Sequence, residues 1–102
     1  MSRYATASVE TLLAVLHAEL PALREFGVVR IGIFGSRVRG SGGANSDLDV
    51  LVELGDHRDL LDLIAVKQHL ESVFDLAVDA TTPSGLRESC RQSILDEVRY
   101  AT

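Results

Sequence analysis

The sequence predicts a small α/β or α+β domain in which a mixed sheet of three to four strands is covered by helices. Helical apolar stripes alternate along the chain with short runs of β-branched and apolar residues. A Gly/Ser-rich loop separates the first two of these runs. Because 102 residues supply one hydrophobic core but not a second folded unit beside it, we expect a single domain over residues 1–102.

The first predicted element is an amphipathic helix over residues 9–23. Its apolar side chains recur at steps of three and four residues. Ser8 is placed to cap the start and Gly27 to end the helix. Pro21 removes a backbone hydrogen bond, so we expect the helix to kink or restart there.

Two buried strands are predicted next. Residues 28–34 are apolar and β-branched and run directly into Gly35-Ser36, which indicates a strand that ends in a tight turn. Residues 48–52 form the second apolar run, bounded by Gly55. Residues 40–46, between the two strands, have the composition of a flexible loop.

The second half of the chain predicts a helix, a strand and a further helix. The apolar pattern favours a long helix over residues 60–70, and residues 73–80 alternate well enough for a third strand. Thr82-Pro83 fits the cap and first-turn positions of a last helix that ends near Tyr100. Its apolar stripe repeats every four residues, at Leu86, Cys90, Ile94 and Val98.

Charge and composition restrict the classes of function. Ten basic and fifteen acidic side chains give a net charge of −5, which disfavours direct nucleic-acid binding. No apolar run approaches the length of a membrane span, and no leader pattern follows Met1. Cys90 is the only cysteine, so no internal disulfide forms, and we expect a reduced, soluble, cytoplasmic protein without membrane contact. The histidines lack metal-ligand spacing.

The residues that carry chemistry are Gly35-Ser36 and, after ten intervening residues, Asp47 and Asp49. Gly35 lets the backbone approach a phosphate closely, and Ser36 offers a hydroxyl and an N–H group. Since side chains alternate along a strand, Asp47 and Asp49 point to one side. Two converging carboxylates suit Mg²⁺, which takes one or two carboxylates plus substrate phosphates. The pattern therefore predicts a magnesium-bound nucleoside triphosphate.

A third carboxylate is needed to deprotonate an acceptor hydroxyl or to hold a second ion. Asp79 is the preferred residue, because an ionised group among the apolar residues of the third predicted strand is costly without a metal or a partner. Asp75 has the same strand parity and is the rival. Arg37 and Arg39 either contact phosphates or form the solvated face of a short helix, with Arg39 the stronger candidate.

Other nucleotide-binding sites are excluded by their missing motifs. The chain has no Gly-x4-Gly-Lys-Ser/Thr sequence and therefore no P-loop. It has no Gly-x-Gly-x-x-Gly after the first strand, which excludes the dinucleotide fingerprint.

From residue 12 onward the sequence resembles the polymerase-β-like nucleotidyltransferase superfamily, and within it the minimal nucleotidyltransferases that act as MntA-type antitoxins. Five segments carry the resemblance: Phe34–Gly40, Ser46–Val52, Val78-Asp79, Thr82-Pro83 and the final predicted helix, which ends near Val98-Arg99-Tyr100. The resemblance implies the polymerase-β-like fold for the predicted sheet and helices.

The resemblance also implies the roles of individual residues. Gly35 and Ser36 are expected to bind the β- and γ-phosphates of ATP, with help from Arg39. The catalytic triad is expected to consist of Asp47, Asp49 and Asp79. These three carboxylates are expected to ligate two Mg²⁺ ions.

A partner follows from the same resemblance. Such proteins transfer AMP from ATP to a tyrosine of a HEPN-domain ribonuclease toxin and thereby neutralise it. Two alternatives stay open: neutralisation of the partner by binding alone, and nucleotidyl transfer to a small molecule.

Overall fold

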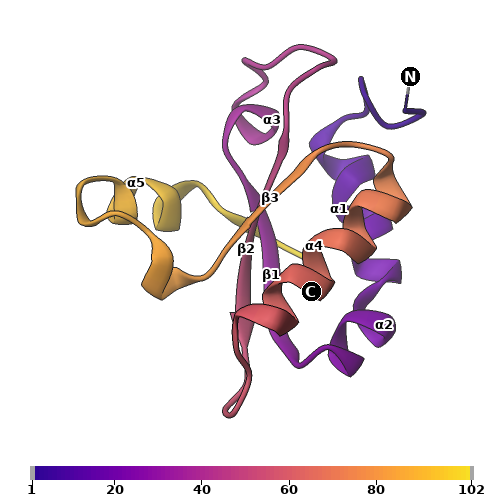
Figure 1. Ribbon diagram of the computed structural model, residues 1–102. Coiled ribbons are helices and arrows are strands. Elements are labelled where there is room, and N and C mark those ends of the chain that lie inside the picture. The colour runs from indigo at the N-terminus through magenta and orange to yellow at the C-terminus, as the bar shows by residue number, and fades with distance from the viewer. Residues whose placement is uncertain (1, 102) are drawn as a thin grey trace.

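The computed structural model describes residues 2–101 (Figure 1). Four strands and five α-helices alternate along these residues, with one short 3-10 helix, η1, before the last α-helix. In chain order the elements are α1 (Val9–Ala18), α2 (Leu20–Glu25), β1 (Val28–Phe34), α3 (Ser36–Arg39), β2 (Leu48–Leu54), α4 (Leu60–Phe74), β3 (Val78–Thr81), η1 (Pro83–Gly85), α5 (Glu88–Glu97) and β4 (Arg99–Tyr100).

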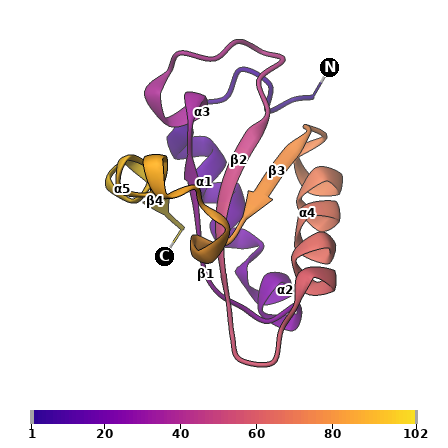
Figure 2. The same cartoon turned by 60° about the vertical axis from the view of Figure 1, so that its left-hand side comes forward.

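The strands form one mixed sheet in the order β3-β2-β1-β4. β1 pairs antiparallel with both of its neighbours, and β2 pairs parallel with β3. A parallel pair needs a crossover between its strands, and α4 provides it, packed beside β3 (Figure 2). The predicted mixed sheet covered by helices is confirmed.

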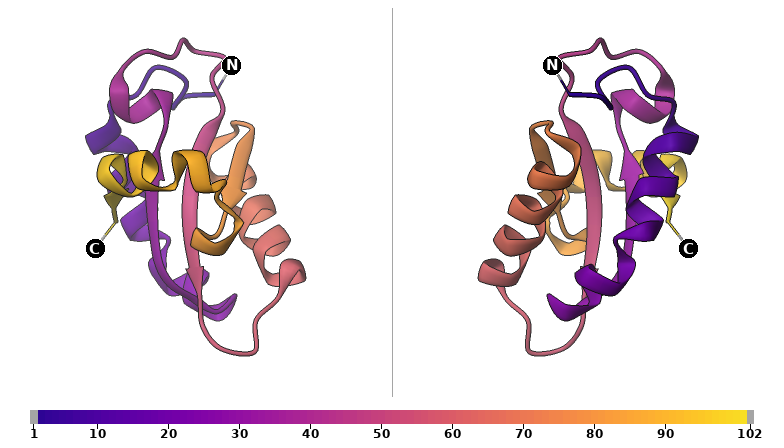
Figure 3. Two further views of the ribbon diagram at one scale, coloured as in Figure 1. Left: turned by 90° about the vertical axis from the view of Figure 1, so that its left-hand side faces the viewer. Right: turned by 90° about the vertical axis from the view of Figure 1, so that its right-hand side faces the viewer.

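The helices lie on both faces of the sheet. α1, α2 and α4 cover one face, and α5 crosses the other (Figure 3). The core lies between the sheet and the helices α1, α2 and α4. The strands contribute every second residue to it, such as Ile31 and Ile33 on β1 and Val50 and Val52 on β2. Asp49 stands between buried neighbours and therefore points toward the α5 face.

The start of the fold follows the predicted pattern. The Ser8 side chain caps α1 by accepting a hydrogen bond from the Thr11 N–H. The helix stops at Ala18, and α2 restarts at Leu20 with Pro21 in its first turn, where the missing N–H costs no helical hydrogen bond. Gly27 follows α2 with φ of 90°. The expected restart at Pro21 is confirmed.

The boundary between α4 and β3 differs from the prediction. Residues 73 and 74 belong to α4 and not to a strand. Phe74 is fully buried and continues a stripe with Val66 and Leu70 at four-residue spacing, so the core-facing helical period prevails over the local alternation. Asp75 caps the helix with φ of 53° and does not lie on a strand.

The C-terminal elements also differ from the prediction. Thr82-Pro83 begins η1, and α5 starts only at Glu88 because Leu86 and Arg87 have extended backbone. The helix ends at Glu97, and the next residues form β4, whose Tyr100 pairs with Gly32 of β1. Between residues 2 and 101, no helix combines the length and apolar character that crossing a membrane requires.

Candidate active site

The turn between β1 and α3 depends on a glycine. Gly35 has φ of 84° and ψ of −155°, a backbone conformation that residues with a Cβ rarely adopt. A Cβ added at this position would lie 2.2 Å from Oδ2 of Asp49. The sequence therefore needs glycine here for two reasons: the backbone conformation, and the close approach of the turn to a carboxylate of the neighbouring strand.

The three predicted aspartates gather beside this turn. Asp47 lies directly before β2 and Asp49 is its second residue, so both stand at the end of the strand nearest to Gly35. Asp49 is paired with Asp79 across the parallel β2–β3 ladder. Paired residues of a parallel ladder project from the same face, so Asp79 lies on the same side of the sheet as Asp49. The rival residue, Asp75, is the C-cap of α4 and lies outside the sheet.

The charges of this cluster act on Asp49. Burial, followed by the negative charges of Asp79 and Asp47, raises the pKa of Asp49 to about 6. Arg39 acts in the opposite direction, and Glu97 adds a further negative charge. The folded chain thus holds several carboxylates close enough to oppose the ionisation of Asp49.

The donor set fits a cation that arrives with phosphate groups. Among residues 2–101, no three His, Cys, Asp or Glu side chains form a ready-made metal cluster. Mg²⁺ does not require one, because it binds through one or two carboxylates together with waters and phosphate oxygens. A cation at Asp49 and Asp79 would relieve the repulsion that raises the Asp49 pKa.

Arg37 has neither of the roles considered for it. Its guanidinium donates hydrogen bonds to the backbone carbonyls of Ala5 at 2.8 Å and Ser46 at 2.6 Å, with a longer one to Ala44 at 3.4 Å. Its Nε is buried without a hydrogen-bond partner. Arg37 is therefore a structural brace that fastens the loop before Asp47 to the N-terminal segment.

Arg39 stands at the site with a partner that sequence reasoning missed. Its Nη1 donates to both carboxylate oxygens of Glu97, at 3.1 Å and 2.8 Å. Glu97 Oε1 also accepts the Gly35 N–H at 2.6 Å. Glu97 is the last residue of α5 and is not part of the apolar stripe of that segment, so no local sequence pattern indicates its role.

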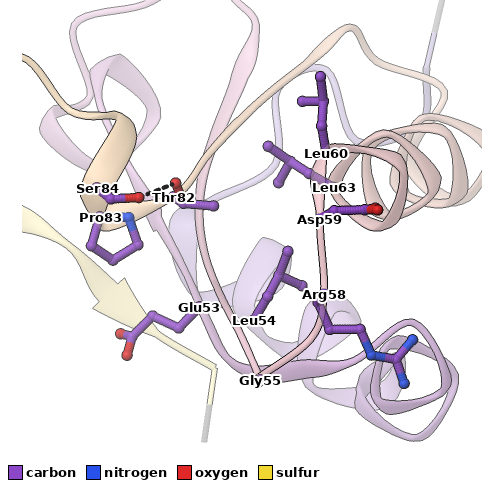
Figure 4. A pocket seen from close by; sticks show the side chains of 10 residues that line it. All are labelled: Glu53, Leu54, Gly55, Arg58, Asp59, Leu60, Leu63, Thr82, Pro83 and Ser84. Atoms are coloured by element: carbon purple, nitrogen blue, oxygen red, sulfur yellow. Dashed lines mark hydrogen bonds between the residues drawn. The ribbon is translucent and has the colours of Figure 1, made fainter.

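One cavity lies away from the carboxylates. It encloses about 580 Å³ near the other end of β2, between Leu54, the start of α4 and Pro83 (Figure 4). A smaller hollow of about 260 Å³ adjoins Ser36 and the loop that follows α3. Asp47 and Asp79 are exposed and Asp49 is half-buried, so the carboxylate site is an open rim at this end of the sheet.

The histidines and the cysteine lie apart from this site. His69 Nε2 lies 2.7 Å from Glu19 Oε1, a contact between α4 and the junction of α1 and α2. Cys90 is a free, half-buried thiol on α5.

A turn with a mandatory glycine, facing carboxylates on two neighbouring strands, is an arrangement for handling a phosphorylated ligand through cations. Comparison with known proteins leads to the same class. The family model of the nucleotidyltransferase domain matches residues 19–101. The chain belongs to this nucleotidyltransferase family and is a nucleotidyltransferase.

Two relatives in sequence are protein adenylyltransferases by name. The chain is 38% identical to the protein adenylyltransferase MntA of Thermococcus cleftensis over 94 residues, which cover 91% of this chain and 95% of the relative. It is 40% identical over 78 residues to a candidate protein adenylyltransferase of Methanocaldococcus jannaschii, covering 76% and 84% of the two chains.

Solved structures share the fold. A candidate minimal nucleotidyltransferase superposes with a TM-score of 0.78 at 36% identity, over 92% of this chain and 96% of the other. A toxin–antitoxin complex with AMP-PNP gives a TM-score of 0.65 at 22% identity, over 92% and 72%. At that identity the second likeness concerns the fold alone.

Proposed function

We propose that this nucleotidyltransferase transfers AMP from Mg-ATP to a tyrosine hydroxyl of a HEPN-domain toxin and acts as its antitoxin. The observation that carries the proposal is the placement of Asp49 and Asp79 side by side on adjacent strands, next to the Gly35 turn. Relatives in sequence support the reaction by their names as protein adenylyltransferases.

The partner is inferred from structural neighbours. One is a tri-AMPylated HEPN toxin from Shewanella oneidensis in complex with its MNT antitoxin, with a TM-score of 0.62 at 19% identity. The open rim around Asp49 supports a protein acceptor, because a second molecule is needed to cover the reacting groups. The net charge of −5 supports an acceptor other than nucleic acid.

The residues of the site have distinct roles in this proposal. Gly35 and Ser36 bind the β- and γ-phosphates, and Arg39 neutralises part of their charge. Asp47, Asp49 and Asp79 hold the metal. When bound, Mg²⁺ draws the phosphates to the carboxylates and neutralises charge on the attacking and leaving oxygens, with two ions in the full arrangement.

The transfer step conserves atoms and charge. The acceptor oxygen forms a bond to the α-phosphorus, and the bond from the α-phosphorus to the bridging oxygen breaks, so pyrophosphate leaves. The hydroxyl proton moves to a carboxylate, for which Asp79 is the candidate, because it is solvent-exposed on the short strand β3. Positioning and charge neutralisation supply most of the rate enhancement.

Labelled nucleotide tests this function. The protein, a HEPN-domain toxin as candidate partner and Mg²⁺ are incubated with ATP labelled at the α-phosphate, and label on the partner is measured. We expect label with the wild type and at least a hundred-fold less with Asp49→Asn, an estimate on the order of what the loss of one transition-state contact costs. Asp56→Asn is the matched control, because it removes the same charge at a residue that is exposed in the turn after β2.

Two results would reject the proposal: no label on the partner with the wild type, or equal label with Asp49→Asn. Replacing the accepting tyrosine by phenylalanine should abolish the label, which identifies the acceptor.

A second candidate function is neutralisation of the partner by binding alone. It is favoured by three exposed apolar side chains at the start of α4, since clustered exposed leucines are a feature of protein contact surfaces. Leu60 is 67% exposed, Leu61 74% and Ile64 39%.

Growth of cells that express the toxin separates the two candidates. Under the proposed function, Asp47→Asn/Asp49→Asn fails to restore growth, although the variant still binds the toxin in a pull-down. Full restoration by this double variant would establish binding as sufficient.

A further inference from the structure

The carboxylate of Glu97 occupies the hydrogen-bond donors beside the phosphate turn. Its Oε1 accepts the Gly35 N–H at 2.6 Å, and both oxygens accept from Arg39 Nη1. Gly35 and Arg39 are two of the three residues expected to bind phosphates under the proposed function. One anionic side chain of the chain itself therefore sits where anionic oxygens of a nucleotide would bind.

The negative charge of Glu97 opposes the binding of a nucleotide at the neighbouring turn. Its charge reaches Asp49, whose ionisation it opposes together with Asp79 and Asp47. A triphosphate brings several more negative charges to the same rim. Gly35 has one N–H group, and a carboxylate that holds it leaves no place there for a phosphate oxygen.

The Glu97 side chain can leave the turn without moving the backbone that carries it. α5 has no buried residue, but the chain after it is anchored, because Tyr100 pairs with Gly32 of β1 and the N–H of the buried Ala101 donates to the Ile31 carbonyl. The Glu97 side chain is itself 20% exposed, and that of Arg39 is 56% exposed. An ion pair with this exposure contributes little free energy, so it opposes a rotation of the Glu97 side chain away from Arg39 only weakly.

We propose that Glu97 is an intramolecular competitor of the nucleotide: its carboxylate closes the phosphate turn in the resting protein and leaves Gly35 and Arg39 when a triphosphate binds. The inference rests on the proposed function for the identity of the ligand. It adds that nucleotide affinity is set partly by the release of the Glu97 side chain from Gly35 and Arg39.

Calorimetry with tripolyphosphate, in the absence of metal, tests the competition directly. We expect Glu97→Ala to bind tripolyphosphate about ten-fold more tightly than the wild type, which corresponds to roughly one charge-assisted hydrogen bond that need no longer be broken. Asp96→Ala is the matched control: it makes the same change of net charge on the same helix, but Asp96 is exposed and its carboxylate accepts a hydrogen bond from Gln92. The control should bind like the wild type.

Glu97→Gln is the second variant, in case alanine perturbs the fold. Its neutral amide keeps the volume but loses the ion pair with Arg39, so we expect affinity between those of wild type and Glu97→Ala. In NMR spectra, tripolyphosphate should shift the Gly35 amide signal more in the wild type than in Glu97→Ala, because only in the wild type does this N–H exchange a carboxylate acceptor for a phosphate.

Equal or weaker tripolyphosphate binding by both Glu97 variants would overturn the inference. Weaker binding would show that Glu97 instead positions Arg39 for the phosphates. The proposed function fails separately, through absence of AMP transfer by the wild type. The two failures are distinguishable because the binding experiment needs neither metal nor partner.

Discussion

Gly35 connects the local chain conformation to the geometry of the site. Its φ of 84° lets β1 turn into α3, and its missing Cβ lets the turn lie against Asp49. Gly40, at the other end of α3, also has positive φ, at 72°, but no atom lies within 4 Å of the Cβ it lacks. A substitution at Gly40 therefore tests the backbone conformation alone, whereas a substitution at Gly35 tests the backbone conformation and a steric contact together.

Gly35→Ala is expected to destabilise the protein more than Gly40→Ala. Each change places a Cβ at positive φ, which costs about 1 kcal/mol. Gly35→Ala adds the contact with Asp49 and a backbone conformation that is almost exclusive to glycine, for a total of about 3 kcal/mol. Urea denaturation of both variants measures the difference. Equal losses would mean that the turn shifts away from Asp49 without cost.

Individual side-chain roles could be predicted only where local sequence determines them. The turn glycine and the same-face aspartates follow from strand alternation and from the conformational freedom of glycine. Arg37 and Arg39 are both basic residues of one short helix, and nothing in the pattern separates a brace from a site residue. Glu97 contacts Gly35 across 62 positions of the chain, a contact that requires the folded sheet.

The loop between α3 and β2 is the element that delivers Asp47 to the site. It carries three glycines, counted over residues 40–46, and therefore has little order of its own. Arg37 supplies the order by binding the carbonyls of Ala5 and Ser46. The segment before α1 consequently lies beside α3 and this loop (Figure 2).

Arg37→Met is expected to cost about 2 kcal/mol of unfolding free energy, because it leaves two carbonyls without their charged donor. Arg39→Met is the matched control: its exposed ion pair contributes less than about 1 kcal/mol. Hydrogen exchange measured by NMR should be faster at the Ser46 amide, which donates to Gly43, in the Arg37 variant only. Unchanged exchange at Ser46 would remove the assignment of Arg37 as a brace.

Element types were predictable where burial and local preference agree, as in β1, β2 and the first part of α4. The end of α4 was not, because residues 73–74 alternate like a strand, and only the buried position of Phe74 decides for helix. β4 was missed for a related reason. Two residues are too few to give a periodic signal, and their strand exists through pairing with β1.

At the scale of the whole molecule, the sheet order brings Asp49 and Asp79 together although α4 separates them in sequence. This placement has a consequence for global stability. Burial and the neighbouring carboxylates raise the pKa of Asp49 to about 6, above its ordinary value of 3.8. The folded chain therefore keeps a proton on Asp49 at pH values where the unfolded chain has lost it.

The contribution of Asp49 to the free energy of unfolding should consequently decrease as the pH rises from about 4 to above 6. Asp49→Asn cannot ionise, so relative to the wild type it should gain stability across this interval. The expected relative gain at pH 7 over pH 4 is about 1 kcal/mol, after allowance for the partial exposure of Asp49 to solvent. Urea denaturation of both proteins at the two pH values measures it, and the comparison across pH cancels any constant effect of the amide.

Asp62→Asn provides a control of opposite sign, because the Asp59 backbone N–H, which donates to the carboxylate, and the nearby Arg58 lower the pKa of Asp62. That carboxylate stabilises the folded chain above its unfolded pKa, and the contribution is lost as the pH falls. Relative to the wild type, Asp62→Asn should therefore lose stability as the pH rises from acid to neutral. A gain with pH for Asp49→Asn and a loss for Asp62→Asn would assign the first effect to carboxylate crowding at the site. Parallel trends in both variants would instead indicate a general effect of removing one negative charge from a chain of net charge −5.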